Sequence, residues 1–283
     1  MTKLMHYCLP VLFLLSNTCN ADAIVIVKVE YAPATMAKGK YAKQGYIDRI
    51  TEEVQNNLPQ YRFLEDFVPT KRLLEMAKSG KAYCFNALVN TPERKNFLNF
   101  TNPYGWVLPM GIVIRADDKD RFLPYLNKDE HINIEDLLKN KEIQFGISSG
   151  RTMGQMIDSH IKPIAAAGDK RVLEIYNDQA TETLFKMLSY KRFHFTIASV
   201  SEMVYHHAPV GEFLFYQVEG NHKLMPVGFS CTKNKATEKV FSDLARTVDT
   251  ERTHKIFQAG YERWLPATMI KPYRKQLSEL QKN

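Results

Sequence analysis

The sequence predicts an α/β fold arranged as two lobes, and three observations lead to this prediction. Short runs of β-branched and aromatic residues alternate with segments of helical spacing, as in parallel sheets flanked by helices. The chain has 283 residues, more than a single hydrophobic core usually serves. No flexible linker is visible, so we expect strands to cross between the lobes and a ligand cleft to lie between them.

The first residues have the pattern of a secretory signal peptide. Lys3 supplies positive charge, residues 7–15 form a short apolar run, and Ala21-Asp22-Ala23 is a small-residue cleavage site. No later run approaches the roughly 20 apolar residues of a membrane helix. We therefore expect residues 1–23 to be removed and the mature protein to be periplasmic.

The remaining chain divides into strand-like and helix-like segments. Strands are expected at 24–29, 61–65, 82–89, 107–114, 144–147, 195–198 and 227–231, where apolar and β-branched residues are frequent. Helices are expected at 46–58, 70–78, 134–138, 152–161, 180–188, 236–246 and 250–264, where apolar residues recur at helical spacing.

Composition excludes several classes of protein. The chain is 45% hydrophobic and 24% charged, so disorder is not indicated. Its net charge is +7, but the basic residues are scattered, which argues against nucleic-acid binding and favours attraction of small anions. No histidines stand at metal-ligand spacing, so neither a metal nor another cofactor is expected. Cys84 and Cys231 follow the signal segment and form either a disulfide or two buried thiols.

An arginine in the first half of the chain is well placed to bind an anion. The sequence Thr-Pro-Glu-Arg at 91–94 follows the apolar strand-like run 82–89 and precedes Phe-Thr-Asn-Pro-Tyr at 100–104. Pro92 favours a turn there, and a guanidinium matches a carboxylate with two parallel hydrogen bonds. Arg94 is therefore expected at the carboxyl end of a strand, where α/β sheets bind ligands.

The order of these motifs resembles the family 3 extracellular solute-binding proteins. Further matches are Tyr-Ala-Pro at 31–33, Gly-Tyr-Ile-Asp at 45–48, Gly-Ile-Ser-Ser-Gly-Arg-Thr at 146–152 and Pro-Val-Gly-Phe at 226–229. The resemblance implies the type II periplasmic binding fold, in which each lobe is a mostly parallel sheet flanked by helices. One lobe would comprise 24–105 and 226–283, and the other 106–225. It also implies a monomer that captures a solute without catalysis, for an ABC importer or a sensory receptor.

Several ligand-binding residues follow from the resemblance. Arg94 matches the arginine that binds the ligand carboxylate, and Tyr31 matches an aromatic residue that packs on the ligand. Gly150, Arg151 and Thr152 match a segment that offers donors at the start of a helix.

Departures from the family pattern point to an anionic ligand. Amino-acid binders carry an aspartate in the second lobe, but the matching stretch here is Thr-Ile-Ala-Ser-Val at 196–200, with Ser199 and no carboxylate. Glu202 lies nearby and reaches the site only if the strand ends early; otherwise it is expected to point elsewhere. Asn86, Ala87 and Val89 stand where relatives tend to have hydroxyl groups. With Lys28 and Arg72 added to the two site arginines, we expect an electropositive cleft that binds a carboxylate or another anion.

Two enzymatic alternatives remain. Gly-Ile-Ser-Ser-Gly at 146–150 fits the nucleophile pattern of hydrolases, with Ser148 followed by Asp178 and by His206 or His207. A few proteins of this fold resemble dehydratases, for which Glu30, Glu202 or Asp178 would supply a proton donor or acceptor.

Overall fold

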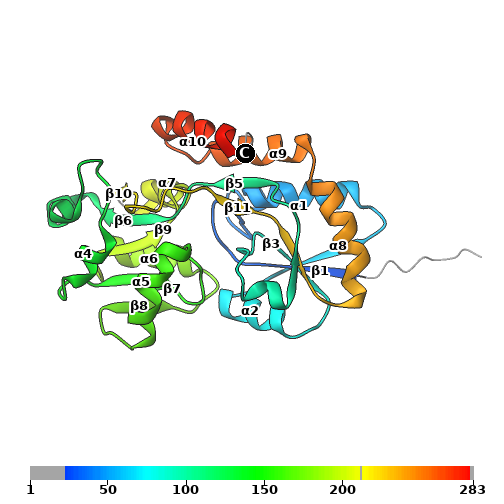
Figure 1. Cartoon of the computed structure of the whole chain (residues 1–283), viewed down its shortest axis with the longest axis horizontal. Helices are drawn as coiled ribbons and strands as arrows, with labels where there is room; N and C mark the ends of the chain where they lie inside the picture. Colours follow the sequence, from blue (N-terminus) through cyan, green and yellow to red (C-terminus); the bar gives the residue numbers. More distant parts are fainter. Residues whose placement is uncertain (1–22, 211, 281–283) are drawn as a thin grey trace, which may run out of the picture.

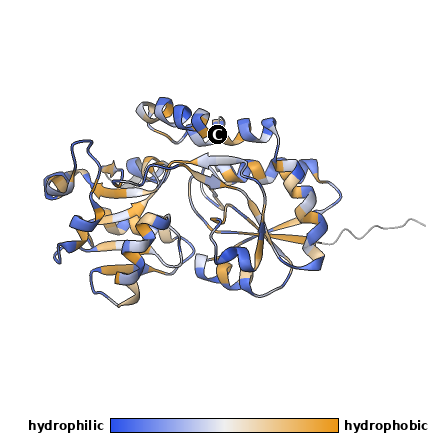
Figure 2. Cartoon of the chain, viewed as in Figure 1, coloured by the Kyte–Doolittle hydropathy of each residue, from blue (hydrophilic) through white to orange (hydrophobic). Residues whose placement is uncertain are grey.

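The chain forms two mixed sheets, each flanked by helices and joined by a two-stranded ribbon (Figure 1). The computed structural model describes residues 23–210 and 212–280. The expected signal peptide lies, apart from its last residue, outside the described residues. Figure 2 shows strands with mainly hydrophobic colouring and helices with hydrophilic residues on their outer sides. The α/β prediction is confirmed.

The first sheet has the strand order β2-β1-β3-β12-β4. Its parallel half consists of β1 (Ala23–Lys28), β2 (Arg62–Phe67) and β3 (Tyr83–Asn86). Its other half is antiparallel and consists of β4 (Leu98–Phe100) and β12 (Phe229–Thr232). The sheet is therefore mixed rather than mostly parallel, because the chain returns to it from the second half of the molecule.

Three helices flank this sheet: α1 (Tyr46–Asn57), α2 (Thr70–Lys78) and α8 (Lys235–Val248). Helix α1 buries Ile47, Ile50 and Val54 at helical spacing. Its first turn is fixed by Asp48, whose carboxylate accepts hydrogen bonds from Gly45 N and Met36 N. This contact closes the loop that carries Tyr31 onto α1.

The second sheet has the order β10-β6-β9-β7-β8. Its strands are β6 (Gly111–Arg115), β7 (Phe145–Ser148), β8 (Val172–Ile175), β9 (Phe195–Ala198) and β10 (Phe213–Tyr216). Strands β7, β8 and β9 are parallel, whereas β6 pairs antiparallel with β9 and β10. The surrounding helices are α3 (Lys119–Phe122), α4 (Ile134–Lys139), α5 (Gln155–Ala166), α6 (Ala180–Ser189) and α7 (Val200–Val210).

A ribbon of two antiparallel strands, β5 (Gly105–Val107) and β11 (Met225–Val227), connects the two sheets. One continuous strand was expected at 107–114, but the segment divides into β5 and β6 around Pro109, which has no N–H for a strand ladder.

The C-terminal helices α9 (Glu251–Glu262) and α10 (Ala267–Leu280) pack along this ribbon (Figure 1). Leu108 N donates to the hydroxyl of Tyr261, and the hydroxyl of Tyr273 donates to Trp106 O. The ring of Trp264 also contacts Tyr205 of α7 edge-on, with ring centroids 5.4 Å apart. Helix α10 and strands β4, β8 and β10 were not predicted, and neither was α7. Pro272 within α10 disfavours a helix assignment, and the missed strands have only three or four residues.

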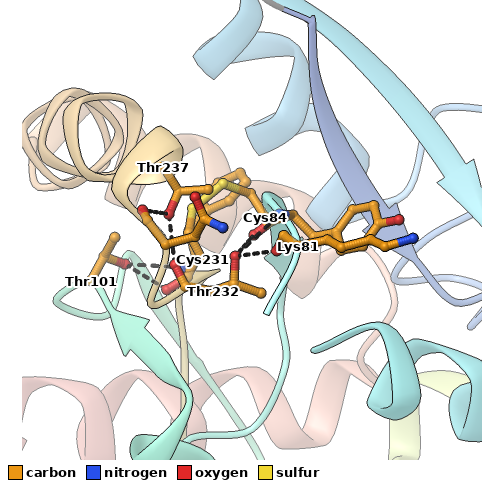
Figure 3. Close-up of a disulfide and its surroundings, with 9 residues drawn as sticks. Lys81, Cys84, Thr101, Cys231, Thr232 and Thr237 are labelled. Atoms are coloured by element: carbon orange, nitrogen blue, oxygen red, sulfur yellow. Dashed lines mark hydrogen bonds between the residues drawn. A yellow bond between two sulfur atoms is a disulfide. The ribbon is translucent and has the colours of Figure 1, made fainter. Parts of the chain in front are cut away.

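Cys84 and Cys231 form a disulfide between β3 and β12 (Figure 3). Both residues are completely buried, and they face each other in the sheet register. The bond joins residues 147 positions apart in the sequence, and the segment between them includes the whole second sheet. Of the two possibilities left open by the sequence, the structure has the disulfide.

Removal of this disulfide is expected to lower the free energy of unfolding by about 2–5 kcal/mol, with the upper end favoured by the long enclosed loop. The measurement is the urea midpoint of Cys84→Ala/Cys231→Ala against the wild-type protein. Ser230→Ala, which removes a buried hydroxyl without a hydrogen-bond partner on the same strand, is the control. Equal midpoints and slopes for the double variant and the wild type would contradict the expectation.

Candidate ligand-binding cavity

A cavity of about 140 Å³ lies where the edges of the two sheets and the connecting ribbon meet. Most of its lining is apolar, with Leu73, Val107, Met110 and Met225 among its members. Six of the eight residues predicted from the sequence also line it: Tyr31, Asn86, Arg94, Arg151, Thr152 and Ser199. A cavity of this size accommodates a molecule with a body of about benzene's dimensions.

Arg94 presents a buried guanidinium to this cavity. It begins a short 3-10 turn (Arg94–Asn96), and its backbone N–H donates to Thr91 Oγ1 at 3.3 Å. One guanidinium nitrogen donates to Val89 O at 2.8 Å and the other to Thr152 Oγ1 at 3.2 Å. No carboxylate of the described residues forms a salt bridge with it, and burial lowers its pKa by disfavouring the charged form. The carboxylates of Glu93 and Asp158 attract this charge from beyond salt-bridge distance, so Arg94 is a buried cation without a directly bonded carboxylate.

Arg151 is the second guanidinium of the cavity, and it already has a counter-charge. Its Nη1 and Nη2 donate to the two carboxylate oxygens of Glu202 at 2.8 and 3.0 Å, the bidentate geometry of a strong ion pair. Its guanidinium carbon lies 4.4 Å from the ring centroid of Tyr31, within the range of a cation–π contact. Although burial opposes ionisation, the charge of Glu202 raises the pKa of Arg151.

Glu202 points into the cavity because of the way α7 begins. Ser199 precedes the first helical residue, and its hydroxyl accepts the backbone N–H of Glu202 at 3.2 Å. The Glu202 carboxylate reaches back to the backbone N–H of Ser199 at 2.7 Å, which completes a capping box. Of the two possibilities left open for Glu202, the structure has the one in which it reaches the cavity: β9 ends at Ala198, and the short connection turns the side chain inward.

The ionisation of Glu202 follows from the same contacts. Burial alone would raise its pKa, but the adjacent Arg151 charge and the hydrogen bonds from Ser199 lower it below the ordinary value. The carboxylate is only 3% exposed, and it stays ionised because its charge is compensated on all sides.

The polar groups of Asn86 and Ser199 are engaged within the protein. Asn86 donates to Thr51 Oγ1 at 3.0 Å and to Ile47 O at 3.4 Å, and it accepts a hydrogen bond from the hydroxyl of Tyr104. The Ser199 hydroxyl contacts Glu202 and Ser201 at 2.9 Å each. Both residues line the cavity, but their hydrogen bonds mainly fix its walls.

Two predicted site residues lie outside this cavity. Arg72 is exposed on α2. Gly150 lines a neighbouring cavity that shares Arg94, Arg151 and Thr152 with the first. Helix α5 begins at Gln155 rather than at Thr152, because Gly154 has a φ of 98°, so residues 150–152 do not form a helix start. The predicted anion site at this helix N-terminus is therefore wrong.

Lys28 does not contribute charge to the cavity either. Its ammonium is 1% exposed and lies in the first sheet, where it binds Asp48 at 2.8 Å and Glu65 at 2.9 Å. The predicted contribution of Lys28 to an electropositive cleft is wrong, because two buried or half-buried carboxylates surround it. Among the described lining residues, the charged groups are Arg94, Arg151 and Glu202.

Sequence reasoning missed several lining residues. Thr70, at the start of α2, shares a hydrogen bond of 2.6 Å with the hydroxyl of Tyr31. Tyr46 lines the cavity and shares a side-chain hydrogen bond with Ser201. The motif Ser-x-x-Glu at 199–202 was the available signal for Glu202, since it is the signature of a capping box. Ala87, also in the lining, has a left-handed φ of 65°, supported by a 3.0 Å bond from its N–H to Gly228 O.

A family model matches residues 23–267, and its description is bacterial extracellular solute-binding proteins, family 3. The chain belongs to this family. No curated protein sequence matches the chain. No helix within the described residues combines the length and the apolar character that a membrane span requires.

Solved structures similar to this solute-binding protein confirm the fold. A histidine kinase sensor domain with similarity to periplasmic binding proteins has a TM-score of 0.65 at 13% identity, covering 87% of this chain and 96% of its own. An ancestral arginine-binding protein bound to glutamine has a TM-score of 0.62 at 18% identity, with coverages of 86% and 97%. An ancestral amino-acid-binding protein, a precursor of cyclohexadienyl dehydratase, has a TM-score of 0.61 at 14% identity, with coverages of 86% and 96%.

The hydrolase triad considered from the sequence is not assembled in this solute-binding protein. Asp178 is exposed. The ring of His206 stacks on Phe185 and its Nε2 has no hydrogen-bond partner, whereas His207 Nδ1 accepts the backbone N–H of Phe213. Neither histidine ring is therefore arranged as a base for the hydroxyl of Ser148. Within the described residues, no group of three or more His, Cys, Asp or Glu side chains is arranged to hold a metal ion.

His206 makes the stability of the protein depend on pH. It is 6% exposed, and burial lowers its pKa from the ordinary 6.5 to about 4. Between these two values the unfolded chain binds a proton at His206 and the folded chain does not, so the free energy of unfolding falls as the pH falls.

His206→Phe, which retains a ring for stacking on Phe185, is expected to remove the contribution of His206 to the pH dependence of the free energy of unfolding. Its stability should decrease less than that of the wild type between pH 6.5 and pH 4, by a margin of about 3 kcal/mol. Urea unfolding at a series of pH values measures the difference, with the exposed His222→Gln as control. Parallel pH profiles for His206→Phe and the wild type would refute the assignment.

Proposed function

We propose that this protein is a periplasmic solute-binding protein that captures a small carboxylate without catalysis. The observation that carries the proposal is the guanidinium of Arg94, which is buried at the cavity wall and has no salt bridge to a carboxylate of the described residues. A ligand carboxylate supplies the missing charge and accepts two parallel hydrogen bonds. The hydroxyl of Thr152, already 3.2 Å from Arg94, is a further donor to the same carboxylate.

The rest of the lining supports an apolar ligand body. Side chains such as Leu73, Leu108 and Met110 surround the space beside Arg94, and a small cavity with few polar groups favours a compact hydrocarbon portion. We infer that the ligand combines one carboxylate with a small aliphatic or aromatic group.

Contacts that bridge the two sheets support a closing mechanism. Arg94 and Tyr31 belong to the half of the molecule with the first sheet, whereas Thr152 and Arg151 follow β7 of the second sheet. A ligand between them favours closure by its contacts on both sides. The ribbon of β5 and β11 is the natural hinge, and we assign the lobes as predicted, to 24–105 with 226–283 and to 106–225.

The ionisation of the site favours binding over catalysis. A dehydratase needs a proton donor or acceptor beside the substrate. Glu202 has a lowered pKa, and its proton-accepting positions are occupied by Arg151 and Ser199. Burial raises the pKa of Glu30, but this residue lines a different cavity. Asp178 is exposed.

The partners of the loaded protein are ABC importer subunits or a sensory receptor. Among the similar structures are the substrate-binding protein of an amino acid ABC transporter and a histidine kinase sensor domain. We propose a monomer exported by the segment 1–23, since both kinds of partner meet their binding protein outside the cytoplasm.

Arg94→Ala is expected to weaken carboxylate binding at least about thirtyfold, because truncation of one partner of a buried charge pair costs about 2–5 kcal/mol. Arg94→Lys should lose part of this affinity, since an ammonium keeps the charge but not the planar fork. Calorimetric titration with a panel of aliphatic and aromatic acids, chosen by thermal shift, gives the affinities. Arg72→Ala, an exposed arginine outside the cavity, is the matched control. Tight binding of an acid by Arg94→Ala would disprove the proposal.

A further inference from the structure

The charged groups of the cavity do not act independently. Two guanidiniums and one carboxylate among the described lining residues give the cavity a net charge of +1. Arg151 and Glu202 neutralise each other through the bidentate contact, so the unmet charge is that of Arg94. The cavity therefore offers a ligand one charged site, at Arg94, which suits a single anionic group.

Glu202 has no free acceptor position for a ligand. Its Oε1 accepts from Arg151 Nη1 at 2.8 Å and from Thr181 Oγ1 at 3.4 Å. Its Oε2 accepts from Arg151 Nη2 at 3.0 Å, and from the backbone N–H and the hydroxyl of Ser199 at 2.7 and 2.9 Å. A carboxylate has about four lone-pair positions, so these five contacts saturate it.

The guanidinium of Arg151 is held in place from a second direction. It lies over the ring of Tyr31 at 4.4 Å, and the hydroxyl of Tyr31 is itself fixed by Thr70 at 2.6 Å. An arginine of the protein therefore covers one face of the Tyr31 ring. Packing of the ligand on the other face stays a prediction. The Arg151–Glu202 pair fills the space, and uses the carboxylate, that would otherwise bind the ammonium of a ligand.

We propose that the Arg151–Glu202 pair is a specificity device that excludes the α-ammonium of amino acids and restricts the ligand to a monocarboxylate with an uncharged body. This inference rests on the proposed function, because it takes Arg94 as the carboxylate site. An α-ammonium would lose its hydration beside Arg151 and find no free acceptor on Glu202. A second carboxylate would have to compete with Glu202 for Arg151.

Substitutions that change the cavity charge test this proposal. The probes are 4-methylpentanoate, leucine and adipate, which have similar size and net charges of −1, 0 and −2, with 3-phenylpropanoate and phenylalanine as an aromatic pair. The wild type should prefer each monocarboxylate over its amino acid, and 4-methylpentanoate over adipate, by at least about tenfold. Arg151→Met frees the Glu202 carboxylate and lowers the cavity charge to 0, so leucine should be preferred. Glu202→Gln raises the charge to +2, so adipate should gain at least about tenfold.

The double variant Arg151→Met/Glu202→Gln has the wild-type cavity charge, and its preference for the monocarboxylates should return. This rescue separates a specificity role from a merely structural one, since both variants disturb the same contacts. Circular dichroism and thermal melting establish that each variant is folded. If Arg151→Met does not fold, the comparison of wild type, Glu202→Gln and the double variant decides.

Several outcomes would overturn the inference. Leucine bound by the wild type as tightly as 4-methylpentanoate would do so, as would unchanged preferences in the charge-altered variants. In either case, loss of all acids in Arg94→Ala would leave the proposed function standing. If the wild type binds none of the acids while folded, the proposed function fails, and the inference fails with it.

Discussion

The ion pair between Arg151 and Glu202 is the constraint on which the cavity depends. Glu202 is fixed by the first turn of α7, through the two reciprocal hydrogen bonds of its capping box with Ser199. The fixed carboxylate of Glu202 binds the guanidinium of Arg151. This guanidinium also lies against the ring of Tyr31, which belongs to the other half of the molecule. Because a buried charge without its partner is strongly unfavourable, neither side chain can turn away independently. A local helix cap thus fixes one of the contacts between the two halves.

The buried cations of the protein differ in whether a carboxylate is bound to them. Lys28 is compensated by Asp48 and Glu65 within the first sheet, and Arg151 is compensated by Glu202 within the second half of the molecule. Arg94 has hydrogen bonds to Val89 O and Thr152 but no such carboxylate. Net charge alone therefore says little about the cavity, since the location of the acidic partners decides which cation remains available for an anion.

The α/β class could be predicted from the sequence because it depends on long periodic segments, such as α1 with Ile47, Ile50 and Val54. Arg94 could be placed by its motif, which follows the buried strand β3 after a short loop. Strand β8 was missed although β7 and β9, of the same length, were predicted, because β8 lies at the edge of its sheet and has no fully buried residue to give a core pattern. Helix α10 was missed because Pro272 opposes a helix that tertiary packing supports. The pairs Lys28–Asp48 and Arg151–Glu202 join residues 20 and 51 positions apart, so no local sequence pattern predicts them. The capping motif at 199–202 does predict the orientation of Glu202.

Under the proposed function, we expect the same distribution of charge to couple ligand binding to closure. Contacts between Arg94 and Thr152 and between Arg151 and Tyr31 exist in the protein itself, so they contribute to the closed arrangement with or without a ligand. A ligand shifts the equilibrium only by the additional free energy that it gains in the closed state. Burial of Arg94 beside Thr152 is unfavourable while its charge is unmet, and an anion removes that cost only where both residues surround it. We therefore expect the guanidinium without a bonded carboxylate to make closure sensitive to an anion, and the pairing of Arg151 to confine this sensitivity to one position.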